Sequence, residues 1–205
     1  MLGKKDKPQP TIRQMELFHD TNLYIPTRTV YFGGGVINED IVDSVTIAQV
    51  IKNLQILEHR DQGESITLVL NSCGGSWEDG IALYDMIRAL KSPVNILAMG
   101  KVYSMGSVIL QAGDKRIMTK HTAMMIHDGL EGVEAPPKAF EAWGEWSKVT
   151  RKQMYEIYYE QMVKKSPDIT LGEIESMCSH DTILSAKNAV DVGLADIIME
   201  DVIKE

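Results

Sequence analysis

Cysteine and basic charge are scarce in this sequence of 205 residues. The two cysteines, Cys73 and Cys178, form neither a CxxC pair nor a cluster with histidine, so no metal site is expected and reduced cytosolic thiols are the plainer interpretation. The net charge of -8 argues against a nucleic-acid partner, because phosphates need a basic face on the protein. These features give no support to a metal, disulfide-scaffold or nucleic-acid function.

Long apolar runs are also missing. The longest apolar region, Val94 to Ala112, is interrupted by polar residues, among them Asn95, Lys101 and Gln111, and does not predict a membrane span. The first ten residues, MLGKKDKPQP, are charged and no apolar segment follows them, so no signal peptide is expected. The sequence therefore predicts a cytoplasmic protein without membrane contact.

What is present predicts an arm followed by a single α/β domain. Residues 1–26 are polar with three prolines and are predicted to form the arm, and residues 27–205 form the domain. Apolar periodicity predicts strands over residues 29–32, 66–70 and 94–99 and helices over residues 38–59, 78–90 and 104–111. Asn38 is expected to cap the first of these helices. Such alternation implies a mostly parallel sheet covered by helices.

The second half of the chain predicts one unusually long helix. It runs from Lys138 to about Lys165, carries many aromatic residues and is too long to lie wholly within a domain of this size, so we expect it to project and to pack on another surface. Shorter elements surround it: strands near residues 116–119, 123–126, 182–184 and 194–198, and helices near residues 171–177 and 185–192.

Two predicted strand-to-helix turns could carry chemistry. In the turn from Asn71 to Gly75, paired glycines can aim backbone N–H groups at an anion or oxyanion, although a tight connection is the simpler interpretation. In the turn that contains Ser104, the serine opens a helix and by itself is more often a helix cap. Both turns follow strands of one parallel sheet, and the carboxyl ends of such strands are where α/β proteins bind ligands.

A nucleophilic serine needs a base. Of the five histidines, His127 follows the buried strand Ala-Met-Met-Ile and lies just before a glycine-containing segment, whereas the others lie in the arm, at a helix end or in loops. A single histidine at a strand end is usually structural unless a partner is found. Asp181 precedes the next apolar run and, by itself, is a poor candidate for that partner.

Four segments together resemble one family. They are Leu-Asn-Ser-Cys-Gly-Gly, Met-Gly-Lys-Val-Tyr-Ser-Met-Gly, Met-Ile-His-Asp-Gly-Leu and Asp-Thr-Ile-Leu-Ser-Ala, in that order, and they resemble the caseinolytic (Clp) protease proteolytic subunit from about Val30 to Ile198. The resemblance implies a Clp/crotonase-type fold of repeated β-α units and a serine endopeptidase with Ser104 as nucleophile, His127 as base and Asp181 as its orienting acid.

The resemblance also implies the remaining site residues and the assembly. The oxyanion amides would be those of Gly75 and Met105, and an extended polypeptide would bind a strand after the base, with substrate contacts at Gly74, Ser76, Asp128, Leu130 and Gly132. The long helix corresponds to the handle by which two heptameric rings stack into a closed tetradecamer, and the arm to an axial gate. No cofactor is implied, since ATP serves only a partner AAA+ unfoldase.

Several departures from the family pattern and three rival functions remain. Cys73 replaces the usual proline of the first turn, Asp128 replaces a common glutamine, and the aromatic residues with which an unfoldase docks are absent at Thr67, Val69 and Ala89. A divergent or phage-type member fits this pattern as well. The rivals are a crotonase-type acyl-CoA enzyme, a non-catalytic ring subunit, and a Ser-Lys peptidase that uses Lys101.

Overall fold

A computed structural model describes residues 10–32, 40–130, 132 and 134–199. The helices are α1 (Ile12–Thr21), η1 (Ile25–Thr27), α2 (Ser44–Arg60), α3 (Trp77–Ala89), α4 (Met105–Leu110), α5 (Pro137–Met162), α6 (Leu171–Cys178) and α7 (Ala186–Asp191). The strands are β1 (Leu23–Tyr24), β2 (Thr29–Phe32), β3 (Ile41–Val42), β4 (Ile66–Ser72), β5 (Gly74–Gly75), β6 (Val94–Tyr103), β7 (Lys115–Thr119), β8 (Ala123–Ile126), β9 (Thr182–Ser185) and β10 (Ile197–Met199). Among the described residues, no helix has the length and apolarity needed to cross a membrane.

The described strands form one mainly parallel sheet and one small separate pair. The large sheet has the order β1-β2-β4-β6-β7-β10, with β8 paired to β6 and β9 paired to β8. The pairs β1–β2 and β8–β9 are antiparallel and the other pairs are parallel. Strands β3 and β5 form the separate pair. The predicted α/β class with a mostly parallel sheet is confirmed.

Strand β6 belongs to two parts of this sheet. Residues 95–98 pair with β7, whereas residues 101–103 pair with β8. Gly100, between these two segments, has a φ of 72°, and the register against β4 shifts at the same level. The sequence predicted that the strand ends at Met99 and that a turn follows. That prediction was wrong, because the glycine lets the strand bend and continue to Tyr103.

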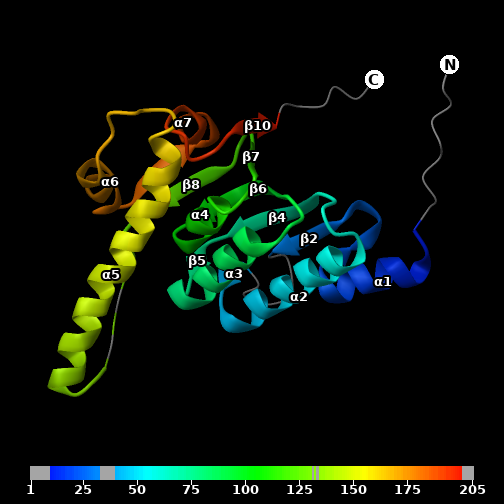
Figure 1. The fold of residues 1–205 in the computed structure, drawn as a ribbon, viewed down its shortest axis with the longest axis horizontal. Helices are drawn as coiled ribbons and strands as arrows, with labels where there is room; N and C mark the ends of the chain where they lie inside the picture. Colours follow the sequence, from blue (N-terminus) through cyan, green and yellow to red (C-terminus); the bar gives the residue numbers. More distant parts are fainter. Residues whose placement is uncertain (1–9, 33–39, 131, 133, 200–205) are drawn as a thin grey trace.

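Helices α2, α3 and α4 cover one face of the sheet (Figure 1). Helix α2 begins later than predicted, because Asp43 is its N-cap and accepts a 2.8 Å hydrogen bond from Thr46 N. The predicted cap, Asn38, lies outside the described residues. Apolar residues of α2 at helical spacing face the sheet, and the core between the layers includes Ile47, Val50, Leu54, Leu57, Leu68, Leu70, Leu83, Ile96 and Ile109.

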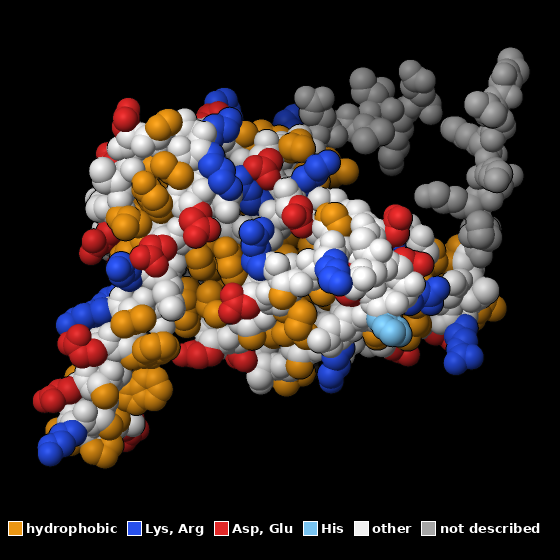
Figure 2. Space-filling model, in the orientation of Figure 1, with side chains coloured by type: hydrophobic (Ala, Val, Ile, Leu, Met, Phe, Trp, Pro, Cys, Tyr) orange, Lys and Arg blue, Asp and Glu red, His pale blue; other side chains and the backbone are white. Residues whose placement is uncertain are grey.

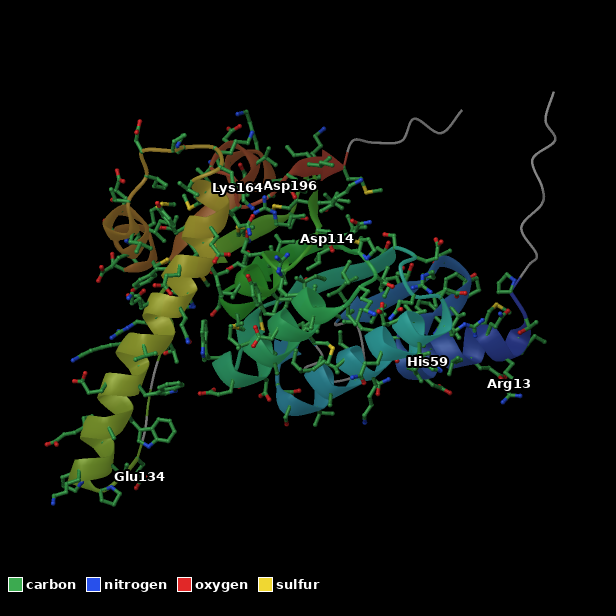
Figure 3. The ribbon with its side chains drawn as sticks, in the orientation of Figure 1. Arg13, His59, Asp114, Glu134, Lys164 and Asp196 are labelled. Atoms are coloured by element: carbon green, nitrogen blue, oxygen red, sulfur yellow. The ribbon has the colours of Figure 1, made fainter. Side chains whose placement is uncertain are left out.

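Helix α5 has one end in the body and one end beyond it. Figure 3 shows Glu134, just before the helix, at its projecting end, and Lys164, just after it, beside the body. The C-terminal half packs into the core through Met154, Tyr158 and Met162, whereas aromatic side chains on the projecting half are about half exposed (Figure 2). The long projecting helix predicted from the sequence is therefore present.

The segment predicted as an arm contains regular structure. Helix α1 begins with a capping box formed by Thr11 and Gln14, and Asn53 of α2 donates a 2.6 Å hydrogen bond to Thr21 O at the end of α1. Leu23, in β1, is buried in the core. This helix was not predicted from the sequence, although Thr11 and Gln14 have the capping-box spacing and apolar residues recur every three positions at Ile12, Met15 and Phe18. The division into an arm and a domain stays a prediction.

Candidate active site

Ser104 connects strand β6 to helix α4 in a backbone conformation that non-glycine residues rarely adopt. Its φ is 51° and its ψ is -125°, and such strained positions gather at functional sites. The turn is held from both sides, because Ser104 N donates to Met125 O at 2.8 Å and Ser104 O accepts from Ser107 N at 2.9 Å and from Ser107 Oγ at 2.6 Å. Ser104 occupies the N-cap position, yet its hydroxyl makes no capping bond to α4, whose residues are all described. The helix-cap interpretation therefore fails.

The glycine turn, from Asn71 to Gly75, contacts the turn that contains Ser104. Gly74 and Gly75 have φ values of 94° and 149°, which favour glycine, and they form strand β5 beside β3. A β-carbon added to Gly74 would lie 3.1 Å from Met105 N. Met105 is the first residue of α4, so its N–H has no partner within the helix. The predicted oxyanion amides, those of Gly75 and Met105, therefore belong to two turns that lie in contact.

His127 and Asp181 meet across the antiparallel pair β8–β9. Ile126 lies opposite Thr182 in the register, so the two residues just beyond this pair also face one another. His127 Nδ1 lies 2.9 Å from Asp181 Oδ1. Because a carboxylate only accepts hydrogen bonds, Nδ1 is the donor in this contact, and in the neutral imidazole Nε2 is then the acceptor. His127 is thus oriented as a general base would be.

Ser104 and His127 line one cavity of about 1090 Å³. Since Ser104 N bonds to Met125 O, the two residues follow neighbouring strand ends. Among the described residues, no hydrogen bond joins Ser104 Oγ to the imidazole, and such catalytic contacts often form only with substrate bound. The structure thus brings nucleophile and base to one cavity and pairs the base with the acid.

Lys101 does not replace the histidine. Its Nζ lies 2.7 Å from Asp40 Oδ2, and this hydrogen bond raises the pKa of the lysine. A lysine base needs a lowered pKa in order to accept a proton at neutral pH. The arrangement therefore argues against a Ser-Lys pair. Among the described residues, no group of three or more His, Cys, Asp or Glu is placed to hold a metal ion.

Comparisons with known proteins give the family of this chain. The family model of the Clp protease matches residues 21–202. This chain belongs to the Clp protease family. A curated relative, the ATP-dependent Clp protease proteolytic subunit 1 of Protochlamydia amoebophila (strain UWE25), is 32% identical over 97% of this chain and 93% of its own length. The ATP-dependent Clp protease proteolytic subunit 3 of Parasynechococcus marenigrum (strain WH8102) is 33% identical over 91% of this chain and 90% of its own length.

The substrate contacts expected from the Clp family lie in or beside the cavity. Ser76, Asp128, Leu130 and Gly132 line the cavity, and Gly74 instead lies against Ser104. The hydroxyl of Ser76 accepts a 3.3 Å hydrogen bond from Asp79 N and so caps α3. Strand β8 ends at Ile126, and residues 127–130 pair with no strand of the described chain, so the pairing of this segment with an extended substrate stays a prediction.

One wall of this Clp-family site was missed from the sequence. Residues of α5 line the cavity, among them Trp143, Ser147, Thr150 and Met154. Their spacing of four, three and four residues places them on one helix face, which is the signal that could have found them. From the sequence, the aromatic residues of this helix are expected only to pack against another ring. Helix α5 is therefore part of the candidate active site.

Proposed function

We propose that this chain is a serine endopeptidase that cleaves peptides and unfolded proteins with Ser104, His127 and Asp181. The observation that carries the proposal is the 2.9 Å contact between His127 Nδ1 and Asp181 Oδ1. The same cavity is lined by Ser104, whose backbone is strained and whose hydroxyl makes no capping bond. Membership in the Clp protease family and relatives named as proteolytic subunits support it.

The proposed chemistry follows the general triad. Ser104 Oγ attacks the peptide carbonyl carbon while His127 Nε2 takes the hydroxyl proton, and Asp181 keeps the other imidazole proton on Nδ1. The amides of Gly75 and Met105 donate to the oxyanion that forms. His127 then returns the proton to the leaving amine, and water releases the acyl group with the same base. The reaction needs no cofactor.

The polypeptide would lie along the cavity between the glycine turn and α5. Leu130 is fully exposed and Gly132 lies two residues further on, so a substrate can contact the backbone of this segment in extended form. Contacts with Gly74, Ser76 and Asp128 would then place the scissile bond over Ser104.

We also propose that the chain assembles as two stacked heptameric rings that enclose the active sites. The half-exposed Phe140, Trp143 and Trp146 on the projecting half of α5 support an interface there, because exposed aromatic side chains in a group mark interaction surfaces. Native mass measurement tests the stoichiometry, and a monomer at micromolar concentration would reject it.

We propose an AAA+ unfoldase as the partner, and only that partner would use ATP. The residues in place of the expected docking aromatics are a half-buried Thr67, a buried Val69 and an exposed Ala89. Measuring degradation of a folded substrate with and without candidate ATPases tests this part. The cytoplasmic location stays a prediction.

A fluorophosphonate probe tests the proposed activity. We expect the wild-type protein to be labelled once per chain and Ser104→Ala to lose both the label and peptide cleavage, by several orders of magnitude. Ser176→Ala, a change on the exposed surface of α6, is the matched control and should keep both. Peptide cleavage that survives in Ser104→Ala would show that the assignment is wrong. An intact assembled particle that takes no label would instead indicate a non-catalytic ring subunit.

A further inference from the structure

A phenol of helix α5 contacts the residue that follows the base. Tyr155 OH donates a hydrogen bond to Asp128 Oδ1 at 2.6 Å, and the tyrosine is 9% exposed. A short bond to a carboxylate is among the stronger hydrogen bonds in proteins. Burial, and next the bond to Asp128, raises the pKa of Tyr155, so the phenol remains a donor at the pH values at which a peptidase is assayed.

Asp128 is held from a second direction as well. Its backbone N donates to Cys178 O at 2.7 Å, and Cys178 is the last residue of α6, three residues before Asp181. Strand β8 ends at Ile126, so His127 itself lies beyond the paired strands. Beyond the sheet, two hydrogen bonds of Asp128 therefore restrain the backbone next to the base. One is made by its backbone N–H and the other by its side chain.

One helical turn further along, α5 also reaches the nucleophile turn. Tyr158 is fully buried, and its OH lies 2.7 Å from Ser107 Oγ, which in turn donates to Ser104 O at 2.6 Å. Residues three apart on a helix lie on the same face, so Tyr155 and Tyr158 approach the site from one side. A single helix thus contacts the supports of both base and nucleophile.

We propose that Tyr155 is a positioning residue, whose hydrogen bond to Asp128 ties helix α5 to the backbone of His127 and so sets the position of the imidazole relative to Ser104. The inference rests on the proposed peptidase function and deepens it. In this inference, Asp128 helps to hold His127 in place, in addition to its predicted contact with substrate. It also makes the position of α5 a determinant of the turnover rate.

The test compares Tyr155→Phe with Tyr159→Phe in peptide cleavage by the assembled protein. Phenylalanine keeps the ring and removes only the hydroxyl, and Tyr159, on the same helix, makes no side-chain hydrogen bond within the described chain. We expect Tyr155→Phe to lower kcat about tenfold, because a small displacement of a catalytic group is costly, and to leave KM within about twofold. Tyr159→Phe should match the wild type. Rates are expressed per active site, counted by fluorophosphonate labelling.

A second pair of variants tests the bond from its other end. The amide oxygen of Asp128→Asn can still accept from Tyr155, whereas Asp128→Ala cannot. We expect Asp128→Asn to keep a kcat at least about threefold above that of Asp128→Ala. This pair also decides the matter if Tyr155→Phe does not fold.

The outcomes separate this inference from the proposed function. Equal kcat values per active site for Tyr155→Phe and Tyr159→Phe, with only a lower thermal midpoint in the former, would mean that Tyr155 is purely structural and would overturn the inference. Equal losses in Asp128→Asn and Asp128→Ala would overturn it as well. Cleavage that persists in Ser104→Ala would instead reject the peptidase assignment, whatever the tyrosine variants show.

Discussion

Gly74 and Ser104 belong to different turns and lie in direct contact. A β-carbon on Gly74 would come within 2.6 Å of Ser104 Cβ and within 2.8 Å of Tyr103 O. The φ of 94° at Gly74 is also one that side chains disfavour. The glycine is therefore required twice over, by its own backbone and by the nucleophile packed against it.

Gly74→Ala should displace Ser104 and lower kcat at least about a hundredfold, because misplacing a nucleophile by a fraction of an ångström to an ångström is costly. The matched control is Gly63→Ala, where φ is 91° but nothing lies within 4 Å of the added carbon. The control should lose about 1–2 kcal/mol of stability from backbone strain alone and keep its kcat. Steady-state kinetics and urea unfolding measure both, and similar kcat losses in the two variants would contradict the contact argument.

The buried pair of Ser107 and Tyr158 should show coupled stabilities. Ser107→Ala leaves the phenol of Tyr158 buried without its 2.7 Å partner and should cost about 2–3 kcal/mol, whereas Tyr158→Phe should cost about 1 kcal/mol. The double variant should cost about 1 kcal/mol less than the sum of the two, because the unpaired hydroxyl is gone. Urea unfolding of the four proteins gives the coupling, and strictly additive costs would mean that the hydrogen bond contributes nothing.

Lys101→Met should distinguish a histidine base from a lysine base. The hydrogen bond that Lys101 donates to Asp40 raises the pKa of Lys101, so the amine stays protonated at neutral pH and cannot take the serine proton. We expect the variant to keep kcat within about tenfold of the wild type. Its activity should still rise between acidic and neutral pH, and this rise should occur at the same pH as in the wild type. Loss of that rise from the pH–rate profile, or a kcat as low as that of Ser104→Ala, would favour the Ser-Lys rival.

The ion pair of Arg116 and Asp196 should make stability depend on pH. Asp196 lies near Lys164 (Figure 3) and forms bidentate hydrogen bonds with the buried Arg116. Burial by itself would raise the pKa of Asp196, but the hydrogen bonds and charge of Arg116 outweigh it and hold the pKa below its usual value. This stabilisation is therefore complete above the ordinary aspartate range, near pH 4, and is lost as the pH falls through the lower folded-state pKa.

Asp196→Asn should cost about 2 kcal/mol at pH 7, between the values for exposed and buried pairs, and the deficit should shrink below about pH 4. Asp191→Asn is the control, because the Lys187–Asp191 pair is exposed on one helix and contributes about 0.5 kcal/mol or less. Urea unfolding at several pH values measures both. A deficit that does not change with pH would show that the carboxylate charge is not responsible.

Local sequence patterns predicted many of the helices and strands of this fold. The strands at β2, β4, β7 and β8 and the helices α3 and α6 lie within about two residues of their predicted bounds, because each has a clear apolar period and clear end signals. Helix α2 was predicted to begin too early because Asn38 and the acids after it imitate a cap, whereas Asp43 makes the actual capping bond. The continuation of β6 was missed because Gly100 is a turn signal in sequence and a bend in the sheet.

By itself, the sequence determined the α/β class, the position of Ser104 at the start of a helix and that of His127 at the end of a strand, since all three depend on residue types and spacing over a few positions. Only the tertiary structure decided that Asp181, 54 residues after His127 in the chain, bonds to its imidazole, because this depends on the antiparallel pairing of β9 with β8. The same holds for Tyr155 and Tyr158, whose hydroxyls meet Asp128 and Ser107 only because α5 packs against the body. Periodicity fixes which face of an element is buried, but the hydrogen bonds that position a catalytic group depend on which elements meet and at what register.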